Sequence, residues 1–157
     1  MTETLPAVAR EVTVKAPPER AFRAFTATTG AWWPASHHIG EKEFAEVVLE
    51  PRAGGRWFER AADGTECEWG RVLAWEPPHR VLLAWHLGTD WKYHPEPESA
   101  SEVEIRFVPE GAGTTRVELV HRGIERHGAG SDALRESVAG EGGWGGILDL
   151  LRAFIES

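Results

Sequence analysis

Trp144-Gly-Gly-Ile-Leu-Asp-Leu-Leu-Arg-Ala-Phe-Ile155, close to the C-terminus, is the stretch that decides the fold. Its large apolar side chains recur at i, i+3, i+4, i+7, i+10 and i+11, which predicts one buried stripe on a helix of about three turns. The stripe consists of Trp144, Ile147, Leu148, Leu151, Phe154 and Ile155. Ser131 or Asp132 is a candidate N-cap for an earlier start of the same helix, with Leu134 and Val138 extending the stripe.

The chain between Phe44 and His121 has a different pattern, in which short runs of alternating apolar residues are separated by turn signals. This pattern predicts five or six strands of an antiparallel sheet. Asp63-Gly64 predicts a two-residue hairpin of type I′, in which both central residues need a positive φ. Five residues of the next run have the same parity, which predicts one sheet face rich in indole: Cys67, Trp69, Arg71, Leu73 and Trp75.

Two further regions frame this sheet. Residues 8–14 alternate as a half-buried strand, and Pro17-Pro18 precedes a short amphipathic helix over residues 19–25. A second helical turn around Trp32-Trp33 then leads into a loop that holds His37 and His38. Residues 88–99 have no periodicity, and a long loop of this kind inside a compact domain is often a functional lid.

The order of these elements predicts an α+β fold, because the last helix is the only large apolar surface that could cover the sheet. We expect a curved antiparallel sheet of about six or seven strands wrapped around a long C-terminal helix, with two short helices after the first strand. A length of 157 residues suits a single domain over residues 1–157.

Composition excludes several classes of partner. Twenty-five acidic against seventeen basic residues give a formal net charge of −8, so the field of the protein repels nucleic acid and anionic membranes. No apolar run approaches the roughly 20 residues of a membrane span, and no signal peptide is recognisable, so a cytoplasmic location is expected. Cys67 is the single cysteine, which excludes an intramolecular disulfide and a cysteine-based metal site.

Four segments of the chain resemble one known family. They are Gly54-Gly-Arg-Trp-Phe-Glu59, Glu68-Trp-Gly-Arg-Val-Leu-Ala-Trp-Glu-Pro-Pro78, Leu119-Val-His-Arg-Gly123 and Gly143-Trp144. Together they are similar, in the same order along nearly the whole chain, to the heat-shock-protein-90 ATPase activator homologues of the SRPBCC, or START-like, superfamily.

The resemblance implies a START-like helix-grip fold with a cavity between the sheet and the C-terminal helix. Members of that superfamily bind hydrophobic small molecules, transport lipids, cyclise polyketides or contact a chaperone, and the fold alone does not choose among these roles. The eukaryotic chaperone activity depends on an additional N-terminal domain, whereas the first strand here is expected within ten residues of Met1. The resemblance therefore supports a chaperone partner less than it supports the fold.

Eight tryptophans in a chain with one tyrosine are the most unusual feature of the composition. A single indole is most often ordinary core, but the predicted elements bring several of these rings together under the last helix. An aromatic pocket with a few polar groups is typical of a small-molecule site. We therefore expect a ligand site formed by Trp33, His38, Trp57, Trp69, Trp85, His121 and Trp144.

The titratable residues support less specific hypotheses. His37, His38, His86, His94 and His121 could meet at the cavity mouth, but no metal-binding spacing such as H-E-x-x-H is present, so neither a metal nor another cofactor is expected. Glu46, Glu59, Glu68 and His121 are candidates for acid–base chemistry. Gly140-Glu-Gly-Gly-Trp-Gly145 matches G-x-G-x-x-G formally, but no strand precedes it, and its glycines instead suggest a kink or a close approach.

Three functions remain open from the sequence. The first is binding of a small hydrophobic or aromatic molecule without assigned catalysis. The second is an enzyme of the polyketide cyclase or dehydratase type, and the third is a module that interacts with a chaperone. Nothing in the sequence marks a dimer interface, so a homodimer is an open alternative as well.

Overall fold

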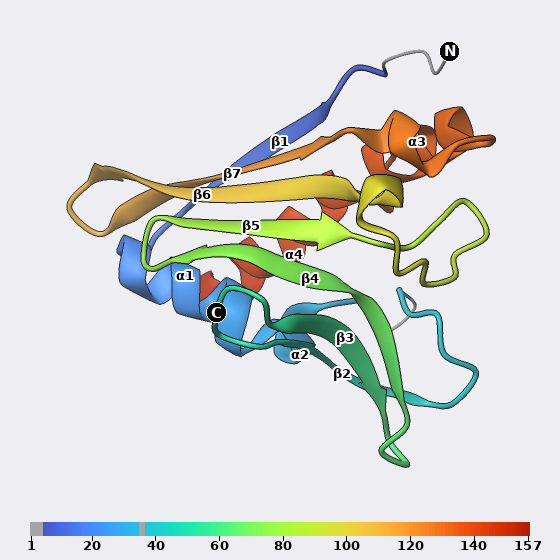
Figure 1. Ribbon diagram of the computed structural model, residues 1–157. Coiled ribbons are helices and arrows are strands. Elements are labelled where there is room, and N and C mark those ends of the chain that lie inside the picture. Colours follow the sequence, from blue (N-terminus) through green and yellow to red (C-terminus); the bar gives the residue numbers. More distant parts are fainter. Residues whose placement is uncertain (1–4, 35–36) are drawn as a thin grey trace.

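Seven antiparallel strands form one curled sheet in the order β1-β7-β6-β5-β4-β3-β2 in this computed structural model (Figure 1). The structure describes residues 5–34 and 37–157. The strands are β1 (Val8–Val14), β2 (Phe44–Leu49), β3 (Arg56–Ala61), β4 (Glu66–Glu76), β5 (Arg80–Trp85), β6 (Ser101–Gly111) and β7 (Thr114–Arg122). Six of them follow residue 43, so the predicted number of strands is confirmed.

The helices are α1 (Pro18–Ala27), α2 (Thr29–Trp32), α3 (Ser131–Ala139) and α4 (Trp144–Glu156), with short 3₁₀ turns η1 (Pro97–Ser99) and η2 (Ile124–His127). Helix α4 packs against β1, α1, α2 and α3. The α+β class and the helix-grip arrangement expected from the sequence are therefore confirmed.

The core lies between the inner face of the sheet and the helices. Val103, Ile105 and Phe107 of β6 and Val117 and Leu119 of β7 are almost completely buried, as their alternation predicts. Phe107 packs edge-to-face against Phe22 of α1, with ring centroids 5.2 Å apart. This contact packs α1 against the inner face of the sheet.

The predicted single C-terminal helix is in fact two helices. The residue at the N-cap position of α3 is Gly130, and the Ser131 hydroxyl instead donates to the Gly128 carbonyl oxygen. The chain leaves α3 at Gly140 and re-enters a helix at Trp144, so Leu134 and Val138 are buried on a separate element. Phe154, expected on the buried stripe, has 36% of its surface exposed, so the stripe is narrower than predicted.

Strand β4 differs from the regular alternation that its sequence predicts. Register shifts interrupt β4 near Trp69 and again between Val72 and Ala74, so the residues of one parity in β4 do not share one face. Trp69 is buried, whereas Leu73 is 45% exposed on the other face. The bulges insert an unpaired residue, and each insertion reverses the side to which later side chains point.

The hairpin between β3 and β4 also differs in turn type. Gly64 has φ +91°, but Asp63 is not among the residues with positive φ, which excludes type I′. The Gly64 N–H donates to the Ala61 carbonyl, and the Asp63 carboxylate accepts from the Thr65 N–H. A type I turn followed by a left-handed glycine joins the strands here.

Candidate functional site

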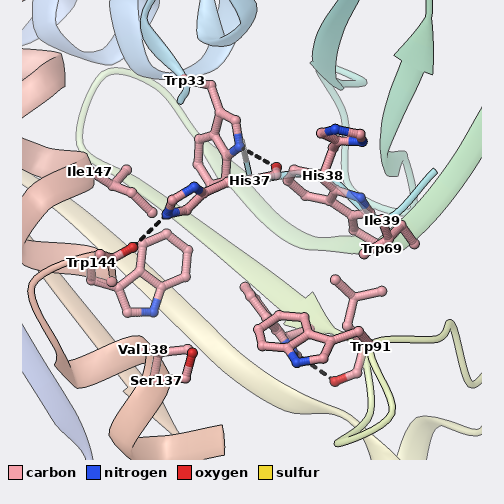
Figure 2. A pocket seen from close by; sticks show the side chains of 14 residues that line it. Trp33, His37, His38, Ile39, Trp69, Trp91, Ser137, Val138, Trp144 and Ile147 are labelled. Carbon is pink, nitrogen blue, oxygen red and sulfur yellow. Dashed lines mark hydrogen bonds between the residues drawn. The ribbon is translucent and has the colours of Figure 1, made fainter. Parts of the chain in front are cut away.

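A pocket of about 280 Å³ opens between the N-terminal end of α4, the segment after α2 and the loop that follows β5 (Figure 2). The described lining residues are Trp33, His37, His38, Ile39, Trp69, Trp85, Leu87, Trp91, Ser137, Val138, Gly142, Gly143, Trp144 and Ile147. Five of them are tryptophans, so the wall is mainly aromatic.

Four of these indoles are locked by hydrogen bonds that point away from their ring faces. Trp33 Nε1 donates to the His37 carbonyl at 2.9 Å and Trp85 Nε1 to the Leu87 carbonyl at 2.9 Å. Trp69 Nε1 donates to the Glu59 carboxylate at 2.8 Å, and Trp144 Nε1 donates to His121 Nδ1 at 3.0 Å. Satisfied N–H groups leave apolar ring surface for a ligand.

The rings also support one another. Trp33 lies 5.3 Å from Trp69 and 6.2 Å from Trp144, and Trp85 lies 5.7 Å from Trp144, measured between ring centroids. Tilted and edge-to-face pairs of this kind are the favourable aromatic geometries. The wall is therefore preorganised and does not depend on a ligand to assemble it.

Five of the seven residues predicted for the ligand site line this pocket: Trp33, His38, Trp69, Trp85 and Trp144. The other two, Trp57 and His121, lie behind the lining. Trp57 packs edge-to-face against Trp69 at 5.6 Å and against Trp85 at 5.8 Å. Both residues support the wall, and contact of any of the seven with a ligand stays a prediction.

His121 belongs to a buried hydrogen-bond chain that sequence reasoning missed. Its Nε2 is 2.8 Å from the Ser101 hydroxyl, which is 2.7 Å from His127 Nε2. Burial lowers the pKa of His121 to about 3 and that of His127 to about 4, so both rings are neutral near pH 7. Because the indole of Trp144 can only donate, His121 carries its proton on Nε2 and donates to Ser101. Ser101 then donates to His127.

Glu59 of β3 is the buried carboxyl group next to the pocket. It is 2% exposed, and its oxygens accept from the Ile39 N–H at 2.6 Å, the Gly40 N–H at 3.1 Å and Trp69 Nε1. Glu59 therefore points into the interior of the domain and not toward solvent. Its parity with the buried Trp57 is the signal that could have placed it inside.

His37 and His38 are the titratable side chains among the described lining residues. His37 Nε2 donates to the Gly142 carbonyl at 2.6 Å and so ties the loop after α2 to the start of α4. His38 stacks on Phe44 with ring centroids 5.5 Å apart, and its Nδ1 lies 3.6 Å from Glu59 Oε2. These two rings bring proton-transfer chemistry to the pocket.

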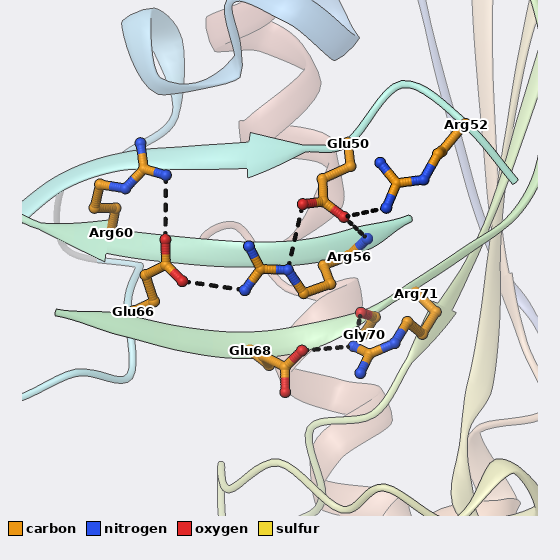
Figure 3. A network of polar contacts seen from close by, with 8 residues as sticks. All are labelled: Glu50, Arg52, Arg56, Arg60, Glu66, Glu68, Gly70 and Arg71. Atoms are coloured by element: carbon orange, nitrogen blue, oxygen red, sulfur yellow. Dashed lines mark hydrogen bonds and ion pairs between the residues drawn. The ribbon is translucent and has the colours of Figure 1, made fainter. Parts of the chain in front are cut away.

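The other histidines do not join them. His86 Nδ1 donates to the His94 carbonyl, and His94 Nε2 contacts the Asp90 carboxylate at 3.0 Å. Within residues 5–34 and 37–157, no group of three metal-ligating side chains is close enough to hold an ion. Glu46 forms an ion pair with Arg60 on the sheet surface. Glu68 forms an ion pair with Arg71, which Figure 3 shows.

Trp91 covers the pocket from the loop after β5. It is 43% exposed, its ring packs edge-to-face against Trp85, and its φ of +58° is the one positive value for a non-glycine residue in the described chain. Backbone strain at a bulky residue is uncommon away from functional positions. Hydrogen bonds between Gly88 and both Trp91 and Lys92 hold this conformation.

Comparison with known proteins places these features in a family. The family model described as activator of Hsp90 ATPase homolog 1-like protein matches residues 15–156. A search of curated proteins finds no match. No helix within the described residues is long and apolar enough to cross a membrane.

Solved structures extend this comparison. An anthrahydroquino-γ-pyrone synthase, Txn09, is 41% identical, with 99% of this chain and all of that chain covered and a TM-score of 0.69. The self-sacrificing resistance protein CalC from Micromonospora echinospora is 28% identical, with 96% and 94% covered and a TM-score of 0.69. CalU16 from the same organism is 25% identical, with 98% and 79% covered and a TM-score of 0.60. From the family match over residues 15–156, this chain belongs to the activator of Hsp90 ATPase homolog 1-like family within the SRPBCC superfamily.

Proposed function

We propose that the chain binds a planar polycyclic aromatic molecule in the pocket and catalyses ring closure on it, as a cyclase. The observation that carries this proposal is the wall of five indoles, four of which have their N–H groups satisfied by hydrogen bonds within the protein. Flat aromatic ligands gain both apolar burial and ring-to-ring contacts against such a wall.

The size and polarity of the pocket fit this ligand class. Small-molecule pockets usually measure about 300–1,000 Å³ and combine apolar walls with a few polar groups. At about 280 Å³, this pocket suits a compact, flat ligand that extends past Trp91 toward solvent. His37 and His38 are the polar groups that could take up and return a proton during ring closure.

The reaction type is supported by the most similar of the three structures described above. That protein is named a synthase of an anthrahydroquino-γ-pyrone, which is a fused aromatic product. Binding without turnover is the second candidate, and the likeness to a self-sacrificing resistance protein favours it. A chaperone partner rests on the family name alone.

Titration with 1,8-dihydroxyanthraquinone, a planar tricyclic phenol, tests the binding part of the proposal. We expect saturable quenching of tryptophan fluorescence and a higher melting temperature, because the ligand would stack on the pocket indoles and bind the folded state only. Trp75→Phe is the matched control, since Trp75 packs on Phe22 away from the pocket. No quenching and no change in melting temperature at saturating dye would contradict the proposal.

A further inference from the structure

The contact between His38 and Glu59 links a pocket residue to a buried carboxylate. Glu59 Oε1 accepts from the Ile39 N–H and from Trp69 Nε1, and Oε2 accepts from the Gly40 N–H. All three partners are donors, which is the environment of an ionised carboxylate that acts as acceptor only. Oε2 also lies 3.6 Å from His38 Nδ1.

His38 Nδ1 is buried and has no hydrogen-bond partner within the described residues. A buried polar nitrogen without a partner is uncommon in a folded protein and calls for an explanation. Its distance to Oε2 is an ion-pair distance, slightly too long for a hydrogen bond. A small movement of the loop toward β3 would complete the bond, as often happens when a ligand closes a site.

The loop that carries His38 is built to approach Glu59. The two backbone N–H groups that follow His38 both donate to the carboxylate. A Cβ atom at Gly40 would lie 3.0 Å from Glu59 Oε2 and 3.2 Å from Cys67 Sγ, so a glycine permits this close approach. Phe44 stacks on the imidazole and fixes its plane.

From this geometry we infer that His38 is the general base of the pocket and that Glu59 is its positioning residue. The inference rests on the proposed cyclase function and adds the class of substrate, a phenol that adds to a conjugated carbonyl group. Once the loop movement completes the bond, Glu59 Oε2 accepts a hydrogen bond from the Nδ1–H of His38, which leaves the lone pair on Nε2 free. The negative charge of Glu59 then compensates the imidazolium that forms.

The proton and electron balance of this step closes without a co-reactant. The phenol proton passes to His38 Nε2, and the oxygen electron pair forms the new C–O bond. The π electrons of the attacked carbon move to the conjugated carbonyl oxygen as an enolate. His38 then returns its proton to the enolate, so the product is an isomer of the substrate.

A probe reaction tests the base without the natural substrate. The compound 5-nitrobenzisoxazole is a flat aromatic molecule that opens when a base removes its carbon-bound proton. The electron pair of that C–H bond becomes the third bond of a nitrile, the N–O bond breaks, and a coloured phenolate forms. We expect the protein to catalyse this opening, with His38 as the group that removes the proton.

His38→Gln is expected to lower kcat/KM for the probe at least about tenfold, since a general base contributes about 10²–10⁴-fold. Glu59→Gln is expected to lower kcat for the probe and to leave KM close to the wild-type value, because the imidazolium that forms during proton transfer loses its nearby negative charge. Glu46→Gln, a surface glutamate of β2 paired with Arg60, is the matched control and is expected to keep the wild-type kcat and KM.

Glu59→Asp covers the case in which Glu59→Gln does not fold. It keeps the charge but moves it away from His38, so we expect a kcat between those of the wild type and Glu59→Gln. A wild-type kcat in a folded Glu59 variant would overturn the role of Glu59. Equal rates for wild type and His38→Gln, with 1,8-dihydroxyanthraquinone still bound by both, would overturn the base but not the proposed binding. Failure of the wild type to bind the dye would overturn both.

Discussion

His121 is completely buried, and its unusual protonation behaviour has a consequence for stability. An unfolded histidine has a pKa near 6.5, whereas burial lowers the pKa of folded His121 to about 3. The stabilising contribution of the neutral ring is therefore present above pH 6.5 and is lost as the pH falls from 6.5 toward 3. The ring must stay neutral because Trp144 and Ser101 occupy both of its nitrogens.

We predict that the free energy of unfolding decreases by up to about 1.4 kcal/mol per pH unit below pH 6.5 because of His121 alone. His121→Gln is the test, since a glutamine side chain can accept from Trp144 and donate to Ser101 without titrating. Urea unfolding between pH 7 and pH 4.5 should give a flatter pH dependence for this variant, even if its stability at pH 7 is lower. Equal slopes for the two proteins would contradict the buried neutral histidine.

Trp91 provides a second prediction at the scale of one residue. Its ring is 43% exposed at the pocket and packs on Trp85, so a bound aromatic molecule would cover surface that water contacts now. Trp91→Ala is expected to weaken binding of 1,8-dihydroxyanthraquinone about three- to tenfold, the value of one aromatic contact. Leu73→Ala, which removes an equally exposed side chain on the opposite sheet face, should leave the titration curve unchanged. Equal affinity of Trp91→Ala and wild type would show that the loop does not cover the ligand.

At the scale of elements, the break between α3 and α4 forms one side of the pocket. The break depends on Gly143, where a Cβ atom would lie 2.0 Å from the Val138 carbonyl oxygen. Backbone atoms cannot move aside as a flexible side chain can. Gly145 lies two residues further along, inside α4. A Cβ atom there would meet the Arg10 side chain at 3.7 Å, which is an ordinary van der Waals contact.

These two glycines make a matched pair of tests. Gly143→Ala is expected to destabilise the protein by at least about 2 kcal/mol, because the chain must shift to relieve the clash. Gly145→Ala is expected to stabilise it by up to about 1 kcal/mol, since alanine is the better helix residue and the space is free. Chemical unfolding of both variants checks the signs. A neutral Gly143→Ala would mean that the break is not held by close backbone packing.

The elements also show how far the sequence could predict this structure. Strands in which apolar and polar residues alternate strictly, such as β6 and β7, were predictable because one face is buried and the other is exposed to solvent. The bulges in β4 were not, because an unpaired residue leaves the composition of a strand unchanged and only reverses its faces. The gap between α3 and α4 was indicated by the glycines around Trp144, but the separate helix was not.

The site was more difficult to predict than the fold. A residue lines the pocket only if its side chain points to the inner face of the sheet and no other side chain lies between it and the pocket. The parity of Trp57 and His121 correctly points them inward, but Trp69, Trp85 and Trp144 lie between them and the pocket. Ser101 shares the inward parity of its strand, which could have suggested a polar partner for a buried histidine. No pattern could have brought His127 to Ser101, because it lies in a short 3₁₀ turn with no periodicity.

At the scale of the whole molecule, the pocket joins three segments that are far apart in the chain. They are Trp33 with residues 37–39 after α2, residues 85–91 at the end of β5 and after it, and residues 137–147 across the α3–α4 break. Figure 1 shows these segments gathered at one end of the curled sheet, away from the hairpin that joins β6 and β7. The candidate site therefore lies at the end of the sheet away from the β6–β7 hairpin.

A crystal structure of the protein with 1,8-dihydroxyanthraquinone is the most direct test of this account. We predict density for one flat molecule in the pocket of about 280 Å³, with its rings against Trp33, Trp69 or Trp144 and its hydroxyl edge toward His38. A well-diffracting crystal grown at saturating dye, with this pocket empty or with the dye bound only elsewhere, would contradict the proposed site.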